Sequence, residues 1–148
     1  MAFEQLKLDN QICFPIYAAS RLITREYQPH LDKLGITYPQ YLVLMVLWEN
    51  DNLTVNDITK KLILNTNTIT PLLKRMESQG LITKQRSGDD ERKVIITLTG
   101  KGKNMQTDAA EIPEKLAASL TESINVEQLS DLKEKLYQVI NFLVEKNS

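Results

Sequence analysis

The sequence predicts a mainly α-helical protein, a single domain over residues 1–148, that carries one small β-hairpin. Apolar residues recur at spacings of three and four along most of the chain, which is the pattern of amphipathic helices. Two strand-like runs, 81–85 and 93–98, flank a charged turn that contains glycine. Hydrophobic residues make up 42% of the 148 residues, enough for a packed core and too many for a disordered chain.

The first helix is predicted to begin near Cys13. Pro15 is tolerated best in a first turn, and Pro29 and Gly35 mark the far end of the apolar pattern. The apolar stripe of this helix consists of Ile12, Ile16, Ala19, Ile23 and Tyr27.

A second helix follows, because Thr37 and Gln40 have capping-box spacing and residues 41–48 are nearly all apolar. Such a helix is expected to be buried on most sides. After a polar turn, Thr54 caps a short third helix that extends to about Leu62, with an inner face of Val55, Ile58 and Leu62.

The fourth helix is predicted within residues 65–80, ending at Gly80, a residue suited to a left-handed cap. Pro71 requires that its regular part starts near Thr68, after a looser turn. Beyond the hairpin, Thr99 caps a helix expected to run to about Leu120, with a bend near Pro113. The last helix has an apolar side made of Leu129, Leu132, Leu136, Val139, Ile140 and Leu143.

Two short helices followed by a basic hairpin are typical of a winged helix-turn-helix. An α-helix fits the major groove of duplex DNA, and its first residues meet the base edges. Lys74 and Arg75, one or two turns further on, suit phosphate contacts. The alternative for this polar run is a loop with an N-cap. The predicted base-reading residues are Asn65, Thr66, Asn67, Thr68 and Thr70.

The hairpin turn carries the basic residues Arg86, Arg92 and Lys93 beside three acidic residues, 89–91. Asp90 is close enough in sequence to orient Arg92 outward, toward a minor groove. The alternative is a solvated turn in which the acidic residues pair with the basic ones.

The net charge of -1 hides a strong polarisation along the chain. Residues 71–103 contain eight basic and four acidic side chains, whereas residues 104–148 contain four basic and eight acidic ones. Two ordinary solvated faces would give this charge distribution, and so would a basic DNA-binding region followed by an acidic segment. No apolar run is long enough to span a bilayer and no signal peptide is evident, so we expect a cytoplasmic protein.

The one cysteine, Cys13, cannot form an internal disulfide, and no residue cluster indicates a metal or another cofactor. A cysteine on an amphipathic helix most often packs in the core as a small hydrophobic residue, which is the alternative interpretation of Cys13. Phenol O–H groups, however, stabilise a thiolate by hydrogen bonding, and a thiolate attacks peroxides. Helical spacing places one thiol and four hydroxyls in a stripe: Cys13, Tyr17, Ser20, Thr24 and Tyr27.

Taken together, residues 81–83, the wing sequence Asp90-Glu91-Arg92 and the helix start Leu98-Thr99-x-x-Gly102 resemble the MarR family of transcription regulators. The resemblance extends over essentially the whole chain. It implies a dimer whose terminal helices interlock and whose two recognition helices enter successive major grooves. The DNA-binding part would then be residues 37–99, and the dimerisation part residues 1–36 and 100–148.

Residues 11–14, Tyr17, Tyr27 and residues 36–41 are similar to the organic-hydroperoxide-sensing branch of that family. This resemblance implies that Cys13 is the reactive cysteine, that Tyr27 and Tyr38 hydrogen-bond it, and that Tyr17 is a third nearby tyrosine. Residues 65–67, Asn-Thr-Asn here, depart from the Asp-Ser-Gly that is common in close relatives.

The expected protein is a non-enzymatic, homodimeric repressor of a pseudo-palindromic duplex operator, released when an organic hydroperoxide oxidises Cys13. The resulting sulfenate would pass to a small cellular thiol, to a backbone nitrogen, or on to sulfinate. Three alternatives remain: a repressor that responds to a phenolic ligand, a one-cysteine thiol peroxidase, and a winged-helix adaptor that binds no DNA.

Overall fold

The computed structural model describes residues 3–90 and 92–148, and the chain divides into two compact units, Met1–Ala110 and Glu111–Ser148. The described elements of the first unit are the 3₁₀ helices η1 (Glu4–Leu6) and η2 (Leu8–Asn10), α1 (Cys13–Leu34), α2 (Tyr38–Glu49), β1 (Leu53–Thr54), α3 (Val55–Leu62), α4 (Thr66–Ser78), β2 (Ile82–Arg86), β3 (Val94–Leu98) and α5 (Gly100–Ala109). The second unit contains α6 (Ile112–Leu120) and α7 (Val126–Lys146). None of the helices in these described ranges is long and apolar enough to cross a membrane.

Helix α1 begins at Cys13, as predicted, but it continues through Pro29 to Leu34. Gly35 ends the helix in the left-handed conformation, with φ 72°, which glycine adopts without a steric penalty. Leu31 is fully buried, so packing holds the last turn in place beyond the proline. The first half of the apolar stripe, in contrast, is exposed: Ile12 is 75% and Ile16 44% accessible.

Helix α2 lies at the centre of the first unit, which confirms the burial predicted from its composition. Thr37 and Gln40 form the expected capping box, and six of the twelve helix residues are buried. Helices α1, α3, α4 and α5 all contact α2. The buried residues of α2 are Gln40, Tyr41, Val43, Leu44, Val46 and Leu47.

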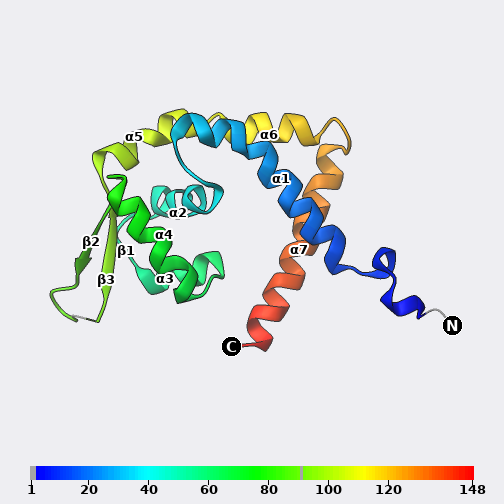
Figure 1. Cartoon of the computed structure of the whole chain (residues 1–148), viewed down its shortest axis with the longest axis horizontal. Coiled ribbons are helices and arrows are strands. Elements are labelled where there is room, and N and C mark those ends of the chain that lie inside the picture. Colours follow the sequence, from blue (N-terminus) through cyan, green and yellow to red (C-terminus); the bar gives the residue numbers. More distant parts are fainter. Residues whose placement is uncertain (1–2, 91) are drawn as a thin grey trace. The chain divides into compact units, whose positions relative to one another are not determined.

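The sheet is antiparallel with strand order β1-β3-β2. The predicted hairpin is confirmed, with Ile82 opposite Leu98 and Arg86 opposite Val94. β1 adds a short outer strand by pairing Leu53 with Ile96, a pairing that only the fold reveals. Within this unit, α3 and α4 pack beside the sheet, and the β2–β3 hairpin extends beyond them (Figure 1).

The single helix expected between Thr99 and Leu120 is two helices. α5 ends at Ala109, and α6 begins at Ile112 with Pro113 in its first turn. Proline has no N–H, and its ring clashes with the carbonyl four residues earlier, so a first turn is its favourable helical position. The helix is therefore interrupted before Pro113, where the sequence predicted only a bend in one continuous helix.

Candidate DNA-binding surface and cysteine site

Helix α4 starts at a well-defined cap. The Asn65 side-chain oxygen accepts hydrogen bonds from the Thr68 backbone N–H at 2.9 Å and from the Thr68 hydroxyl at 3.1 Å. Asn65 thus satisfies an N–H that would otherwise be unpaired at the helix start. Of the five predicted base-reading residues, Asn65 and Thr68 are therefore engaged with each other, and Thr66, Asn67 and Thr70 retain side chains exposed on the first turns.

The position of Pro71 corrects one expectation. Regular helix begins at Thr66, two residues before the predicted start, and Pro71 lies inside it. Only the backbone carbonyl of Asn67 loses its helical N–H partner, and both residues are exposed, so water can reach that group. The exposed side of α4 also carries Lys74 and Arg75. Its opposite side is buried and consists of Ile69, Leu72, Leu73 and Met76.

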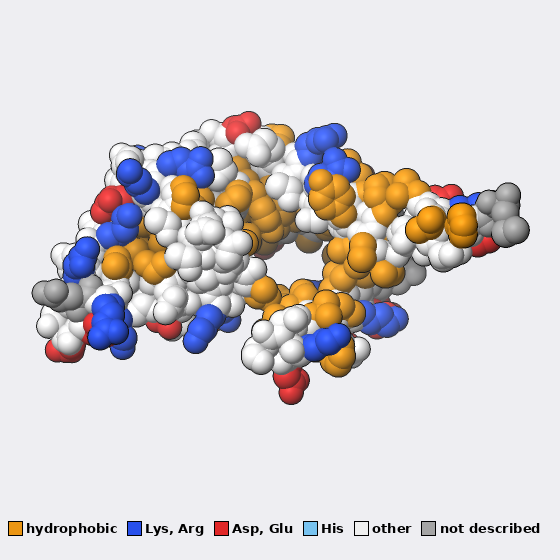
Figure 2. All heavy atoms as spheres, turned by 60° about the horizontal axis from the view of Figure 1, so that its bottom comes forward, with side chains coloured by type: hydrophobic (Ala, Val, Ile, Leu, Met, Phe, Trp, Pro, Cys, Tyr) orange, Lys and Arg blue, Asp and Glu red, His pale blue; other side chains and the backbone are white. Residues whose placement is uncertain are grey.

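A groove of about 580 Å³ lies between α3, the start of α4 and the hairpin. Thr66 and Thr70 of α4 form part of its wall. Figure 2 shows Lys and Arg side chains gathered over the hairpin end of this unit. The cations that line the groove are Lys60, Lys84, Arg92 and Lys93.

Two of these cations were not among the predicted site residues. Lys60 is on α3, and Lys84 is on β2, where it lies 4.0 Å from the Glu77 carboxylate. Lys60 also lies close enough to Asp57 to help lower the pKa of that carboxyl group. The sequence signal that could have indicated Lys60 is its place in the last turn of the short helix that precedes α4.

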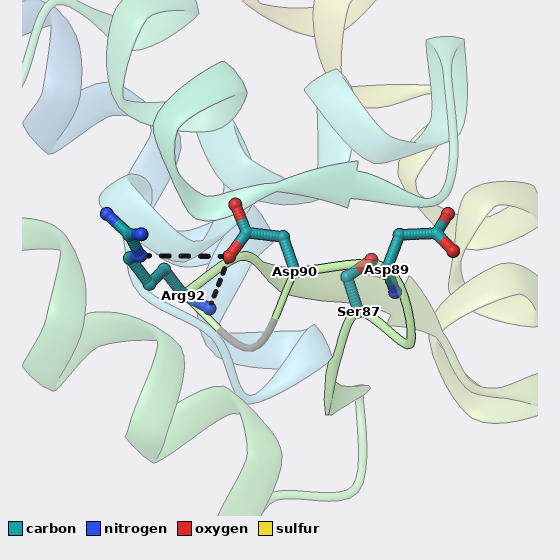
Figure 3. Close-up of polar contacts among 4 residues, drawn as sticks. All are labelled: Ser87, Asp89, Asp90 and Arg92. Carbon is teal, nitrogen blue, oxygen red and sulfur yellow. Dashed lines mark hydrogen bonds and ion pairs between the residues drawn. The ribbon is translucent and has the colours of Figure 1, made fainter.

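The hairpin turn confirms the contact predicted between Asp90 and Arg92. The Asp90 carboxylate accepts a hydrogen bond from the Arg92 backbone N–H at 3.0 Å and lies 4.0 Å from Arg92 Nε (Figure 3). The Arg92 side chain is 96% exposed, so its guanidinium remains accessible to a ligand. The turn is also closed by the Ser87 N–H, which donates to the Lys93 carbonyl at 2.8 Å. Glu91, the middle residue of the predicted wing motif, lies outside the described residues.

Cys13 is the first residue of α1, and it is exposed within the single chain. Tyr17 follows one turn later on the same side and is 62% exposed. The Arg21 guanidinium lies 4.7 Å from the centroid of the Tyr17 ring, a cation–π contact.

Tyr27 and Tyr38 lie together, with ring centroids 5.1 Å apart. Tyr41, which the sequence analysis did not assign to this site, is a third member at 5.7 Å from Tyr27. Its spacing of three from Tyr38 on one helix was the available signal. Burial, and then the neighbouring Tyr38 and Tyr41, raise the pKa of Tyr27 to about 12. Burial also raises the pKa of Tyr38. These phenols are therefore protonated hydrogen-bond donors at neutral pH.

One chain does not bring Cys13 to these phenols. Cys13 and Tyr27 are fourteen residues apart on the continuous helix α1. At a rise of 1.5 Å per residue they are separated by about 21 Å along the helix axis. Of the predicted redox residues, the single chain therefore places Cys13 near Tyr17, and Tyr27 near Tyr38.

Comparisons with known proteins agree with this architecture. Residues 25–109 match the family described as transcriptional regulator SarA/Rot. The organic hydroperoxide resistance transcriptional regulator of Bacillus subtilis (strain 168) is 48% identical over 145 residues, covering 98% of this chain and 97% of the relative.

Solved structures add two comparisons. Reduced AbfR bound to DNA is 39% identical, with a TM-score of 0.80 over 97% of this chain and 99% of that one. AbfR, a protein of Staphylococcus epidermidis, has also been solved overoxidized on DNA and in a disulfide form. A MarR transcriptional regulator from Methanosarcina mazei Go1, 21% identical with a TM-score of 0.79 over 90% of this chain and 96% of that one, shares the fold. The chain belongs to the MarR family of winged-helix transcriptional regulators, in its organic hydroperoxide resistance branch.

Proposed function

We propose that this protein is a homodimeric repressor that leaves its operator when an organic hydroperoxide oxidises Cys13. The observation that supports DNA binding is the groove beside the exposed start of α4, which is lined by Lys60, Lys84, Arg92 and Lys93. Such an arrangement presents polar side chains to base edges and cations to the phosphates on either side. We also propose a cytoplasmic location, where a repressor meets chromosomal DNA.

The start of α4 is the element we assign to the major groove. Asn67 can pair bidentately with adenine, and Thr66 and Thr70 can exchange hydrogen bonds with bases or contact a thymine methyl group. The residues we assign to the phosphates are Lys74 and Arg75 on α4, Lys60, Lys84 and Lys93 in the 580 Å³ groove of the protein, and Arg86 at the end of β2. Arg92 is the residue proposed to enter the minor groove, and Asp90 orients it through the contacts in Figure 3.

A second copy of the chain is the partner proposed for the exposed apolar residues. The N-terminal segment and the start of α1 leave Phe3, Leu6, Leu8, Ile12 and Phe14 between 40% and 75% exposed. Hydrophobic side chains gather at this N-terminal end in Figure 2. Helix α7 has no buried residue, although its side chains include Tyr137, Val139 and Phe142. Large apolar surfaces of this kind favour association, and two-fold symmetry matches a pseudo-palindromic operator with half-sites roughly 34–36 Å apart.

The proposed dimer also explains how Cys13 can meet the tyrosine pair, although the two are far apart within one chain. A single α1 keeps Cys13 about 21 Å from Tyr27, so Tyr27 and Tyr38 can meet only the cysteine of another copy. We therefore place each sensing site between two chains, with Cys13 and Tyr17 from one and Tyr27 and Tyr38 from the other. Protonated phenols there donate hydrogen bonds to the Cys13 thiolate and stabilise it.

Oxidation begins with attack by the Cys13 thiolate on the terminal oxygen of the hydroperoxide. The O–O bond breaks, a sulfenic acid forms, and the alkoxide leaves as an alcohol after taking up a proton. A small thiol then attacks the sulfenic sulfur, giving a mixed disulfide and water. The sequence has no second cysteine for an internal disulfide.

The mixed disulfide is the species proposed to release DNA, because AbfR has been solved bound to DNA in an overoxidized form. Overoxidation alone was therefore compatible with DNA binding in that relative. A thiol adduct adds more bulk than two oxygens do, and it would separate Tyr27 from Tyr38. One oxidation per chain switches the protein, so it acts as a regulator and not as a peroxidase.

The test is fluorescence anisotropy of the full-length protein on duplex DNA from upstream of its own gene. Cumene hydroperoxide with free cysteine should release the wild type, dithiothreitol should restore binding, and Cys13→Ser should stay bound. Release of Cys13→Ser by the peroxide would overturn the sensing mechanism. Peroxide consumption far beyond one equivalent per chain would instead support an enzyme, and release by a phenol without thiol chemistry would support a ligand-responsive repressor.

A further inference from the structure

The end of α4 that is remote from DNA is joined to both helices that carry the tyrosine pair. Gln79, the C-cap residue of α4, accepts a hydrogen bond on Oε1 from Gln40 Nε2 of α2 at 2.9 Å. Its Nε2 donates to the carbonyl of Gly35, the C-cap of α1, at 3.2 Å. One amide group thus contacts α1 and α2, one atom for each helix. We call Gln79, Gln40 and Gly35 the Gln79 junction.

The junction is directly connected to the tyrosine pair through the chain. Gln40 is 4% exposed, and its Oε1 accepts from the Thr37 backbone N–H at 3.1 Å. Thr37 immediately precedes Tyr38, the first residue of α2. Gly35 ends the same helix, α1, that carries Tyr27. A displacement of either tyrosine that moves its helix end therefore changes a hydrogen bond to Gln79.

The junction is also firmly attached to α4. The Gln79 N–H donates to the Arg75 carbonyl at 3.0 Å, so Gln79 is part of the last turn. Lys101 Nζ of α5 donates to the Gln79 carbonyl at 3.0 Å. At 1.5 Å per residue, Thr66 and Thr70 lie about 14–20 Å away along this helix. A helix of this length moves as a rigid element, so a shift at Gln79 repositions the side chains facing DNA.

We propose that Gln79 is the positioning residue that couples the tyrosine pair of the sensing site to the DNA-reading end of α4. This inference rests on the proposed function, because it assigns the route by which Cys13 oxidation lowers operator affinity. Coupling between two sites requires an element whose position both sites influence, and α4 is that element here.

The amide is chemically suited to this role because it needs a donor and an acceptor in fixed places. Glutamate at position 79 could still accept from Gln40, but its second oxygen would face the Gly35 carbonyl. Gln79→Glu therefore breaks the link to α1 and leaves the link to α2. Gln79→Met keeps a similar length and helix propensity and removes both links.

The experiment measures the ratio of operator Kd values for oxidised and reduced full-length protein, which we call the release factor. Oxidation uses one equivalent of cumene hydroperoxide with free cysteine, and intact mass confirms the adduct on Cys13. Couplings of this kind are typically about 5–150-fold. We expect Gln79→Met to lower the release factor at least fivefold while its reduced Kd stays within about threefold of wild type, and Gln79→Glu to give an intermediate factor.

Gln28→Ala is the matched control. Gln28 is an exposed glutamine on α1 whose Nε2 donates to the Asp32 carboxylate, a hydrogen bond within one helix. Its release factor should equal that of the wild type.

The outcomes separate the two proposals. A wild-type protein that carries the Cys13 adduct yet stays on DNA overturns the proposed function and this inference with it. A wild type that is released, with Gln79→Met and Gln79→Glu released by the same factor, overturns the coupling role alone. Weaker reduced binding with an unchanged release factor would show a merely structural role and would also overturn it.

Discussion

The indole Nε1 of Trp48 donates a hydrogen bond to the carbonyl oxygen of Gly102 at 2.9 Å and joins α2 to α5. Gly102 is buried, and α5 approaches the sheet closely at this residue. A Cβ at position 102 would overlap the carbonyl oxygen of Leu81 and meet the Leu98 side chain at 3.1 Å. The glycine of the Leu98-Thr99-x-x-Gly102 sequence is therefore a packing requirement.

Gly102→Ala should destabilise the protein by about 1–3 kcal/mol, because overpacking against backbone forces a shift of α5. Urea unfolding at a fixed protomer concentration measures the change. Gly100→Ala is the control, since a Cβ there meets nothing within 4 Å. Equal midpoints for the two variants would contradict this account of Gly102.

The capping box of α3 should make stability depend on pH. Asp57 accepts a hydrogen bond from the Thr54 N–H at 3.1 Å, and the hydrogen bonds with Thr54 hold its pKa below the ordinary value of 3.8. A lowered folded pKa gives stabilisation that is complete above pH 3.8 and is lost as the pH falls through the lower value. The carboxyl is almost fully solvated, so the effect is small.

Asp57→Asn should therefore unfold more easily than the wild type near neutral pH and approach it in acid. Urea midpoints collected across this range give the comparison. In a Thr54→Ala background the difference should shrink, since the Thr54 hydroxyl, the largest cause of the lowered pKa, is gone and only the backbone N–H remains. A difference between Asp57→Asn and wild type that stays constant down to strong acid would rule out this cause.

Base-reading and phosphate-binding residues should respond differently to substitution. Asn67→Ala should weaken binding by about 1–3 kcal/mol and relax specificity at one base pair of each half-site. Lys60→Ala should weaken binding uniformly across sequences and reduce the salt slope of log K by about 1 for each phosphate that is no longer neutralised. Anisotropy titrations on an operator and on its single-base variants, at several salt concentrations, measure both effects. If the Lys60→Ala protein keeps the wild-type salt slope, Lys60 does not contact a DNA phosphate.

Mixed dimers test where each sensing site lies. A Cys13→Ser chain paired with a Tyr27→Phe/Tyr38→Phe chain leaves one complete site if the site is shared between chains. The remaining Cys13 should then react with cumene hydroperoxide at the wild-type rate. Homodimers of the Tyr27→Phe/Tyr38→Phe chain should react more slowly, because both sites lack the phenol donors. Mixed dimers that react as slowly as these homodimers would place the site within one chain.

The sequence alone determined the features that depend on near neighbours. The capping box of Thr37 and Gln40, the Thr54 cap and the Gly35 terminus are governed by backbone groups within a few residues. The buried character of α2 and the hairpin were equally predictable, because apolar periodicity and turn residues are local patterns. The break before Pro113 was foreseen only as a bend, since how far a helix resists a proline depends on its packing.

Tertiary structure decided which distant residues meet. Tyr41 joins Tyr27, Lys60 lines a groove with Arg92, and Gln40 bonds Gln79 across 39 positions, contacts that no periodicity encodes. The same geometry keeps Cys13 away from Tyr27, although a helical stripe connects them in sequence. A stripe fixes direction around a helix, whereas the rise of about 1.5 Å per residue fixes distance along it. Residues on one face of a long helix can therefore lie too far apart along its axis to belong to the same site.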